Sequence, residues 1–189
     1  MLARLLDDRG VPEPRPPRGE PYAALVRAIV GQQLSVHAAR AIYARLLDRF
    51  GGQPPTPQQI LADEPDELRV AVGLSHAKTA YLRSLAEHVL AGELELDRLE
   101  QLSDEEVIAD LVAVKGIGEW SAHIFLMFTL GRPDVLAVGD LGIRRAVERA
   151  YELPGLPSAP EVTALAEPWR PYRTAACLLL WRSLDNAPT

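Results

Sequence analysis

Residues 112–128 read VAVKGIGEWSAHIFLMF, two apolar helical stretches interrupted by Gly-Ile-Gly. Gly116 and Gly118 carry no β-carbon, so the backbone can take positive φ there and bring its N–H groups close to a flat or anionic partner. A helix that ends before this turn and a second that begins after it leave free amides at a helix N-terminus, where an anion is stabilised by about 0.3–1 kcal/mol. The stretch therefore predicts a helical hairpin able to hold an anion.

Taken alone, the turn allows two interpretations. In one, Ile117 points inward and holds the hairpin together, while Lys115 and the amides around the two glycines contact a backbone phosphate. In the other, the turn is an ordinary corner between two packed helices and has no ligand. The four residues from Lys115 to Gly118 do not decide between the two interpretations. The decision depends on the rest of the chain.

The remaining sequence predicts more helices. Apolar residues recur at helical spacing through 36–50, and Ser103 with Glu106 forms a capping box that starts another helix. Two stretches, about 119–130 and 172–184, are apolar on nearly all sides and should be buried. There is no convincing alternating strand pattern and no Asn-Gly or Asp-Gly hairpin signal. We predict an all-α, compact bundle of about eight to ten helices that contains a helix-hairpin-helix motif.

Prolines and turn signals suggest how this bundle is organised. Four prolines between residues 12 and 17 forbid a helix, so residues 1–21 should form an extended, Pro-rich arm. Residues 22–189 then form the helical domain, with the hairpin at about 104–130 and a loop at 131–140. We treat this domain as one unit, with two lobes separated by a cleft as the alternative.

Charge is distributed unevenly along the chain. The net charge of −6 has the wrong sign for a protein that coats nucleic acid non-specifically. However, residues 93–110 hold eight acids against one base, whereas residues 115–149 hold five bases against four acids. A phosphate-facing side can therefore exist near the hairpin, with an acidic face turned away from it.

The single cysteine and the apolar runs exclude several protein classes. Cys177 lies in an apolar run, which predicts a buried hydrophobic residue. A reactive thiol is the less favoured alternative. One thiol also excludes an iron–sulfur cluster, which needs several. No apolar run approaches the roughly 20 residues of a membrane span. We expect a soluble, cytoplasmic monomer.

Two segments together resemble a known family. LVAVKGIGEWSAHIFLMFTLGRPDVLAVGDLGIRRAV at 111–147, taken with AIVGQQLSVHAARAIYARL at 28–46, resembles the helix-hairpin-helix superfamily of DNA glycosylases. The likeness runs from about Tyr22 to Trp181 and is strongest for the DNA-3-methyladenine glycosylase II branch, which removes alkylated bases. It implies base excision repair: hydrolysis of the N-glycosidic bond of a cationic, 3-methyladenine-type base flipped out of duplex DNA, leaving an abasic site.

The resemblance places the catalytic aspartate at Asp140. Chain length permits this, because residues 131–139 can span up to about 30 Å and so return from the far end of the preceding helix. A cationic base leaves without a strong general acid, and one ionised carboxylate can stabilise the cationic sugar and orient water. The sequence also predicts Asp140 as the N-cap of the helix that follows. The capping role and the catalytic role can coexist.

The resemblance also implies a base pocket. Trp120 and Trp181 match aromatic pocket positions, although core packing is an alternative for each, and Ile124 and Leu141 stand where other members have aromatic residues. A cationic base should stack on such rings. Glycosylases that also cut the strand have a lysine at the position of Trp120, where its amine forms a Schiff base. The resemblance therefore implies a monofunctional enzyme without lyase activity.

Two further contacts with DNA are implied. Gln33 and Leu34 match the loop that fills the gap left by an extruded base, although a loop leucine can instead fold into the core. Arg144 and Arg145 are candidates for phosphate contacts, unless one pairs with Glu148 on the helix surface. The expected partner is double-stranded DNA that contains alkylated bases.

No side-chain metal site is predicted. The four histidines lack metal-ligand spacing with any cysteine, and no cofactor is required. The family sometimes holds a monovalent cation with hairpin carbonyls, which here would come from residues 112–117. Two rival interpretations remain from the sequence: a non-catalytic helix-hairpin-helix module that only binds DNA, and a helical protein-interaction domain consistent with the acidic balance.

Overall fold

The computed structural model describes residues 19–184. Within this range every regular element is helical, with ten α-helices and two short 3-10 helices. The predicted all-α class and helix number are therefore confirmed. The Pro-rich arm expected at 1–21 lies outside the described residues except for its last three, and Pro21 is already the first residue of a helix. The described residues divide into two compact units, 19–125 and 126–184.

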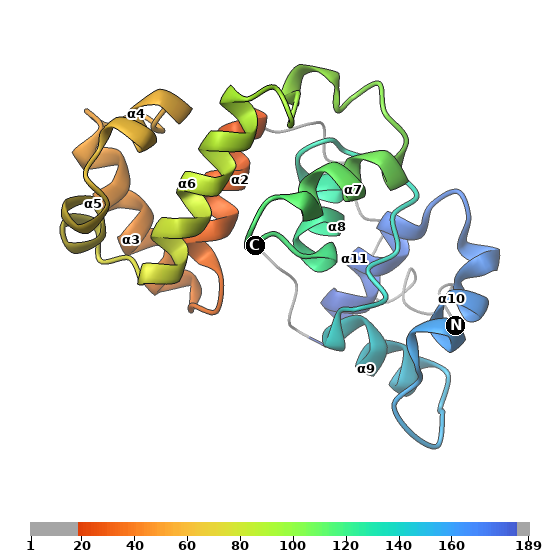
Figure 1. Ribbon diagram of the computed structural model, residues 1–189. Helices are drawn as coiled ribbons and strands as arrows, with labels where there is room; N and C mark the ends of the chain where they lie inside the picture. Colours follow the sequence, from red (N-terminus) through yellow and green to blue (C-terminus); the bar gives the residue numbers. More distant parts are fainter. Residues whose placement is uncertain (1–18, 185–189) are drawn as a thin grey trace. The chain divides into compact units, whose positions relative to one another are not determined.

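The first unit contains the helices from α2 to the first part of α8 (Figure 1). Their bounds are α2 Pro21–Gly31, α3 Val36–Arg49, α4 Pro57–Ala62, α5 Pro65–Val72, α6 His76–Leu90, η1 Leu96–Arg98, α7 Asp104–Ala113 and α8 Glu119–Phe128. Helix α6 packs against α2, α4 and α5, and α3 packs against α2 and α5. Buried leucines and isoleucines fill the space between them, among them Leu25, Ile29, Leu46, Leu82 and Leu85.

Local sequence signals explain where these helices begin. Thr56 and Ser103 each form a complete capping box, with Gln59 and Glu106 as the reciprocal partners. Each cap satisfies backbone N–H groups that the first turn leaves free, and its loss typically costs about 1 kcal/mol. The capping box predicted for α7 is thus confirmed.

The hairpin consists of α7, a turn at residues 114–118 and α8. Ile117 is buried, as expected, and its N–H donates to the carbonyl of Val114 at 3.1 Å. Gly116 has φ of +91°, but Gly118 does not have positive φ. The expectation of a left-handed backbone at both glycines was therefore correct only for Gly116, because one such residue suffices to reverse the chain between the two helices.

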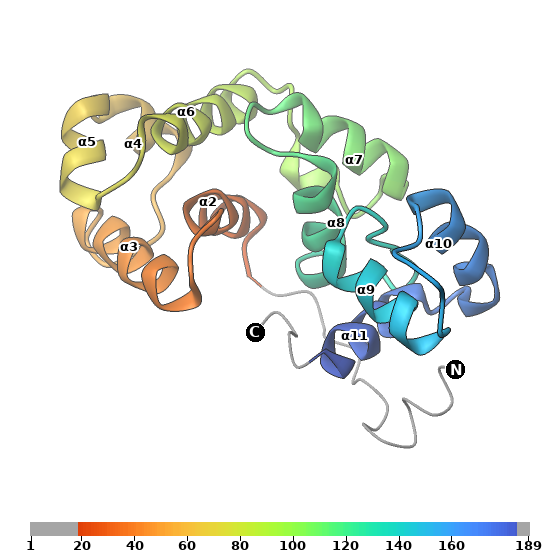
Figure 2. The ribbon, with the colours of Figure 1, turned by 90° about the horizontal axis from the view of Figure 1, so that it is seen from below.

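The second unit contains the end of α8 and three further α-helices (Figure 2). Their bounds are α9 Leu141–Ala150, α10 Ala159–Ala166, η2 Glu167–Trp169 and α11 Arg173–Ser183. Helix α9 packs against both α10 and α11. Cys177 is fully buried in α11, and this burial raises the pKa of its thiol to about 12. The cysteine is therefore a packing residue, because its thiolate is not accessible at neutral pH.

Helix α8 is less buried at its beginning than its apolar sequence predicted. Ala122, Phe125 and Leu126 are buried, but 47% of the Trp120 surface is exposed. The expectation of burial along this whole stretch was wrong for its first turn, because hydrophobic periodicity does not distinguish a ring that packs in a core from one that lines an open pocket.

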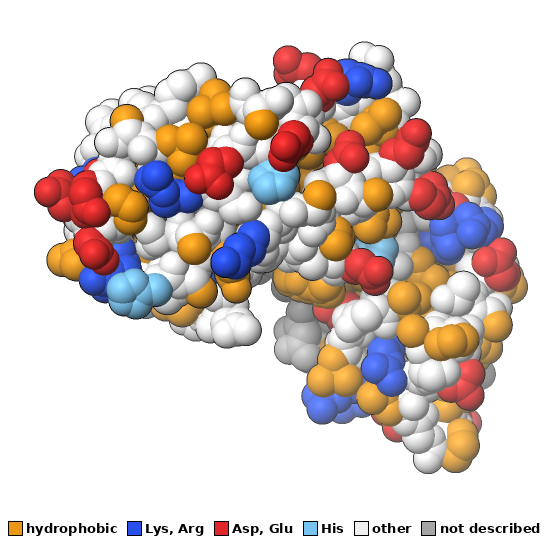
Figure 3. Space-filling model, in the orientation of Figure 1, with side chains coloured by type: hydrophobic (Ala, Val, Ile, Leu, Met, Phe, Trp, Pro, Cys, Tyr) orange, Lys and Arg blue, Asp and Glu red, His pale blue; other side chains and the backbone are white. Residues whose placement is uncertain are grey.

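Acidic side chains gather over α7 and the segment before it, as the space-filling view shows (Figure 3). Glu93, Glu95, Glu106 and Asp110 line a hollow of about 180 Å³ there, together with Arg98. The acidic surface predicted from the local charge excess is thus present. Of the helices within 19–184, none has the length and hydrophobicity that crossing a membrane requires.

Candidate functional site

Asp140 stands at the end of the loop 131–140 and caps α9. Its Oδ1 atom accepts a hydrogen bond from the backbone N–H of Ile143 at 2.8 Å and another from the indole Nε1–H of Trp181 at 2.9 Å. The N-cap role expected from the sequence is confirmed. Two N–H donors and the positive end of a helix attract negative charge and fix the orientation of the carboxyl group.

Trp181 is a packed residue of α11. Only 3% of its surface is exposed, and its ring stacks on Phe128 with centroids 6.3 Å apart. Its face is therefore occupied within its own unit, while its polar edge holds Asp140. A buried indole N–H requires a partner, and here the carboxylate is that partner. The stacking of a base on this ring stays a prediction.

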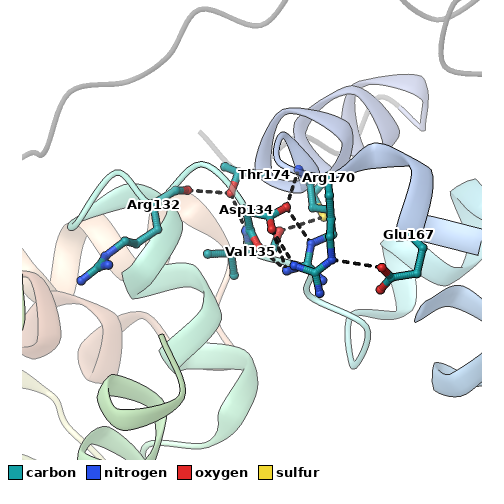
Figure 4. A network of polar contacts seen from close by, with 8 residues as sticks. Arg132, Asp134, Val135, Glu167, Arg170 and Thr174 are labelled. Atoms are coloured by element: carbon teal, nitrogen blue, oxygen red, sulfur yellow. Dashed lines mark hydrogen bonds and ion pairs between the residues drawn. The ribbon is translucent and has the colours of Figure 1, made fainter. Parts of the chain in front are cut away.

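A second set of contacts fixes the beginning of the same loop (Figure 4). Asp134 binds the guanidinium groups of Arg170 and Arg173, at 2.7 Å in each case. Thr174 donates to the carbonyl of Arg132 at 2.7 Å and accepts from the N–H of Val135 at 3.0 Å. The start of α11 thereby anchors the loop at residues 132–135, and Trp181 on the same helix holds its other end.

The charge of Asp134 depends on these arginines. Partial burial alone would raise the pKa of its carboxyl group, but the hydrogen bonds and charge of Arg173, with the charge of Arg170, outweigh it and hold the pKa below its usual value. The contribution of this cluster to stability is thus present above the ordinary aspartate pKa of about 3.9 and lost as pH falls through the lower folded-state pKa. Near neutral pH the loop is fully anchored.

A pocket of about 430 Å³ opens in the first unit. It brings together the hairpin, the segment between α2 and α3, and the beginning of α6. The lining residues are Gln32, Gln33, Ser75, Ala77, Lys78, Tyr81, Gly116, Trp120 and Ser121. Three residues singled out from the sequence for separate reasons, Gln33, Gly116 and Trp120, therefore border one hollow.

The segment between α2 and α3 has a strained backbone. Gln33 has φ of +56°, a left-handed conformation that costs a non-glycine residue about 1–2 kcal/mol. Leu34, which directly precedes the N-cap Ser35, is 37% exposed. The alternative in which this leucine folds into the core was therefore wrong. The structure leaves both side chains accessible.

The other predicted site residues differ in accessibility. Lys115 and Arg145 are exposed, Ile124 is half-buried, and Leu141 is 47% exposed on the first turn of α9. Arg144 is half-buried, and its Nε donates to the carbonyl of Pro157 at 2.7 Å, which ties α9 to the loop before α10. Its phosphate contact stays a prediction, and Arg145 is the more accessible of the two arginines.

A family model matches the stretch of sequence that contains both the hairpin and Asp140. The model described as HhH-GPD superfamily base excision DNA repair protein matches residues 26–171. The chain belongs to the HhH-GPD superfamily. This match includes both residues 31–35 and Asp140, which lie in different compact units.

Relatives within the HhH-GPD superfamily cover most of the chain. It is 39% identical to DNA-3-methyladenine glycosylase 1 of Schizosaccharomyces pombe over 87% of this chain and 72% of the relative. It is 31% identical to a putative DNA-3-methyladenine glycosylase of Bacillus subtilis over 87% of this chain, but it spans only 59% of that relative.

Solved structures of the superfamily superpose closely. A DNA-3-methyladenine glycosidase from Bacillus halodurans matches with a TM-score of 0.87 and 39% identity, over 96% of this chain and 83% of that one. The 3-methyladenine DNA glycosylase of S. pombe in complex with abasic DNA matches with a TM-score of 0.84 and 36% identity, over 97% and 90%.

Several contacts within the two units were not foreseen. Gln32 and Lys78 line the pocket and hydrogen-bond to backbone carbonyls far along the chain, and Asp134 binds Arg173 across 39 residues. The only available signal was the Gln-Gln pair beside a glycine, which does not specify a partner. Such contacts depend on tertiary arrangement and not on local pattern.

The carbonyls of the HhH-GPD hairpin already have some donors. Gly116 accepts from the side-chain amide of Gln32 at 2.8 Å, and Val114 accepts from Ile117. Each carbonyl has a second lone pair, so these hydrogen bonds do not by themselves prevent it from binding a cation, and the cation site stays a prediction. Among the described residues no group of histidine, cysteine or acidic side chains is arranged to hold a metal.

His123 on α8 is a half-buried titratable residue whose Nδ1 atom is buried. Within the described residues its Nδ1 has no hydrogen-bond partner. Burial lowers the pKa of its ring, and the opposing charges of Glu119 and Asp104 do not offset this. The fold therefore favours the neutral ring.

This lowered pKa predicts a pH-dependent stability. The contribution of neutral His123 is complete above the ordinary histidine pKa of about 6.5 and is lost as pH falls through the lower folded-state pKa. Between pH 7 and pH 5, urea unfolding should therefore show a larger loss of stability for the wild type than for His123→Asn. Equal losses in the two proteins would contradict a ring that the fold keeps neutral.

Proposed function

We propose that this protein is a DNA-3-methyladenine glycosylase of base excision repair. It hydrolyses the N-glycosidic bond of alkylated, cationic bases flipped out of duplex DNA and leaves an abasic site. The observation that carries the proposal is Asp140, one carboxylate held at the N-terminus of α9 by two N–H donors. The 39% identity to the S. pombe glycosylase over most of the chain supports it.

The chemistry needs one carboxylate and no strong acid. A base methylated at a ring nitrogen already carries positive charge, so it departs readily and leaves a cationic sugar. Asp140 stabilises that sugar electrostatically and orients the attacking water. Its fixed orientation matters because a preorganised charge needs no rearrangement as the transition state forms.

The residue at position 120 supports a monofunctional enzyme. A glycosylase with lyase activity uses an amine nucleophile to form a Schiff base with the sugar. This chain has Trp120, whose indole cannot do so and whose ring, 47% exposed in the pocket lining, suits cation–π contact with a base. Ile124 and Leu141 are aliphatic where the family resemblance implies aromatic residues, and the proposed enzyme therefore accepts a broad range of alkylated bases.

The proposed partner is double-stranded DNA bound by a monomer. Lys115 and the exposed backbone at Gly118 contact phosphates, with Arg145 as a further phosphate contact. No cofactor is required for the reaction. A monovalent cation held by the carbonyls of residues 112–117 would brace the turn against a phosphate. The protein works in the cytoplasm, in the compartment that holds the DNA.

Base release tests this function directly. Duplex DNA treated with a methylating agent is incubated with the protein, and mass spectrometry identifies free bases, while gels report strand cleavage. We expect 3-methyladenine release and intact strands until the abasic sites are cleaved by alkali. Binding without release would indicate a non-catalytic DNA-binding module. An affinity that does not fall with rising salt would indicate a protein-interaction domain instead.

Trp181→Phe distinguishes positioning from base stacking. Phenylalanine keeps an aromatic ring but removes the N–H that donates to Asp140. A hydrogen bond to a charged group contributes about 1.5–3 kcal/mol, so we expect the single-turnover excision rate to fall at least about tenfold. The matched control is Phe128→Leu, which removes the stacking partner and leaves the donor. A wild-type rate in Trp181→Phe would favour stacking as the sole role.

A further inference from the structure

The segment that carries Gln33 is held from two sides. The side-chain amide of Gln32 donates to the carbonyl of Gly116 in the hairpin at 2.8 Å. The ammonium group of Lys78 donates to the carbonyl of Val30, in the last turn of α2, at 2.8 Å. We call residues 31–35 the wedge segment. One bond thus joins the segment to the hairpin, and the other joins the residue just before the segment to α6.

Helix α6 supports both ends of this arrangement. Lys78 and Tyr81 lie one turn apart on α6, and the Tyr81 ring packs so closely on Gly116 that a β-carbon there would overlap it. One turn further, Ser84 accepts a hydrogen bond from the N–H of Lys115 at 3.3 Å. The hairpin and the end of α2 are therefore both fixed to the same face of α6, and Gln32 joins them directly.

The bond made by Lys78 is partly shielded from water. Burial lowers the pKa of its ammonium group, which reports this loss of solvation. A charge-assisted hydrogen bond strengthens in such surroundings. The last turn of α2 is also the negative end of the helix dipole, which favours a cation. Lys78 is thus well placed to fix the point from which the wedge segment leaves α2.

We propose that Gln32 and Lys78 are positioning residues that hold Gln33, the wedge residue that the family resemblance implies, in its left-handed conformation and couple it to the DNA-binding hairpin. This inference rests on the proposed function. A side chain that fills the gap left by an extruded base recovers part of the unstacking cost only if little is spent on ordering it. The two bonds and the strained φ of Gln33 supply that order before DNA binds.

Gln33 fits this role better than Leu34. Gln33 borders the pocket together with Gly116 and Trp120, whereas Leu34 is not among the residues that line it. Gln33 is also the residue next to the Gln32 contact, so the position of its backbone follows directly from that bond. Its amide can hydrogen-bond to the base left unpaired in the opposite strand.

The test exploits the energy of base opening. Two duplexes carry the same alkylated base, one opposite its normal partner and one opposite an abasic analogue, where pairing no longer has to be broken. Gln32→Met and Lys78→Met remove each donor while keeping the length of the side chain. In single-turnover assays we expect each variant to lose at least about tenfold on the paired duplex and less than about threefold on the unpaired one.

Controls separate this effect from loss of fold or of chemistry. Gln58→Met changes an exposed glutamine on α4 and should behave as wild type on both duplexes. Thermal unfolding identifies any variant that fails to fold. If either Gln32→Met or Lys78→Met fails to fold, the other of the two variants tests the proposal. Equal losses on the two duplexes, or no loss on either, would overturn the proposal. If the wild type released no base from either duplex, the proposed function itself would have failed.

Gln33→Gly tests the wedge assignment independently. Glycine adopts the left-handed conformation without strain but has no side chain to insert. We therefore expect the same selective loss on the paired duplex, with a melting temperature at or above that of the wild type. Leu34→Ala is the matched variant one residue along. A selective loss in neither variant would leave no wedge side chain for Gln32 and Lys78 to position, and would overturn the proposal.

Discussion

Replacing Asp140 by asparagine should lower the single-turnover rate of base excision by about 10³-fold, because a preorganised charge beside the sugar is removed. Asparagine has the same shape and is an equally good N-cap, so its side-chain oxygen still accepts from Ile143 and Trp181. The fold and the affinity for duplex DNA should remain near wild type. Base release, thermal unfolding and DNA titration measure the three quantities separately.

This substitution separates the two roles of Asp140. If it were only a helix cap, the asparagine variant would excise bases as the wild type does, and the proposed mechanism would be wrong. Asp140→Ala provides the comparison, because it removes both the charge and the cap. It should lose about 1 kcal/mol of stability in addition to activity. A large activity loss at unchanged stability in the asparagine variant alone thus assigns the effect to charge.

The features found from sequence are those with local signals. A few neighbouring residues are enough to predict the capping box at Ser103, the Gly-Ile-Gly turn and the burial of Ile117. The N-cap role of Asp140 belongs to the same class, because it depends on the four residues that follow it. Local hydrogen-bonding patterns are fixed by backbone geometry, so they can be predicted without knowing the tertiary fold.

The contacts that were missed all join distant parts of the chain. Trp181 reaches Asp140 across 41 residues, Lys78 reaches Val30 across 48, and Gln32 reaches Gly116 across 84. Which donor meets which carbonyl depends on how helices pack, and periodicity reports only that a face is apolar. Trp120 shows the same limit, since an indole that lines an open pocket and one in a core have identical sequence patterns.

Gly116→Ala should be the most damaging single-methyl change in the hairpin. The residue has φ of +91°, and a β-carbon there would overlap the ring of Tyr81. Strained backbone and overpacking together should cost about 3 kcal/mol, which corresponds to a fall in Tm of about 6–12 °C. Because Gly116 also accepts the Gln32 bond, the hairpin and wedge segment should shift together, and DNA affinity should fall as well.

Gly118→Ala is the matched control, because it adds the same methyl group two residues away. Its φ is not positive, and no atom lies within 4 Å of the added β-carbon, so stability should stay within about 0.5 kcal/mol of wild type. If Gly118 is glycine to let a phosphate approach the backbone, this variant should bind duplex DNA more weakly at unchanged Tm. Unchanged Tm in both variants would mean that the Tyr81 ring moves aside at little cost, and that the contact between α6 and the hairpin is looser than the structure indicates.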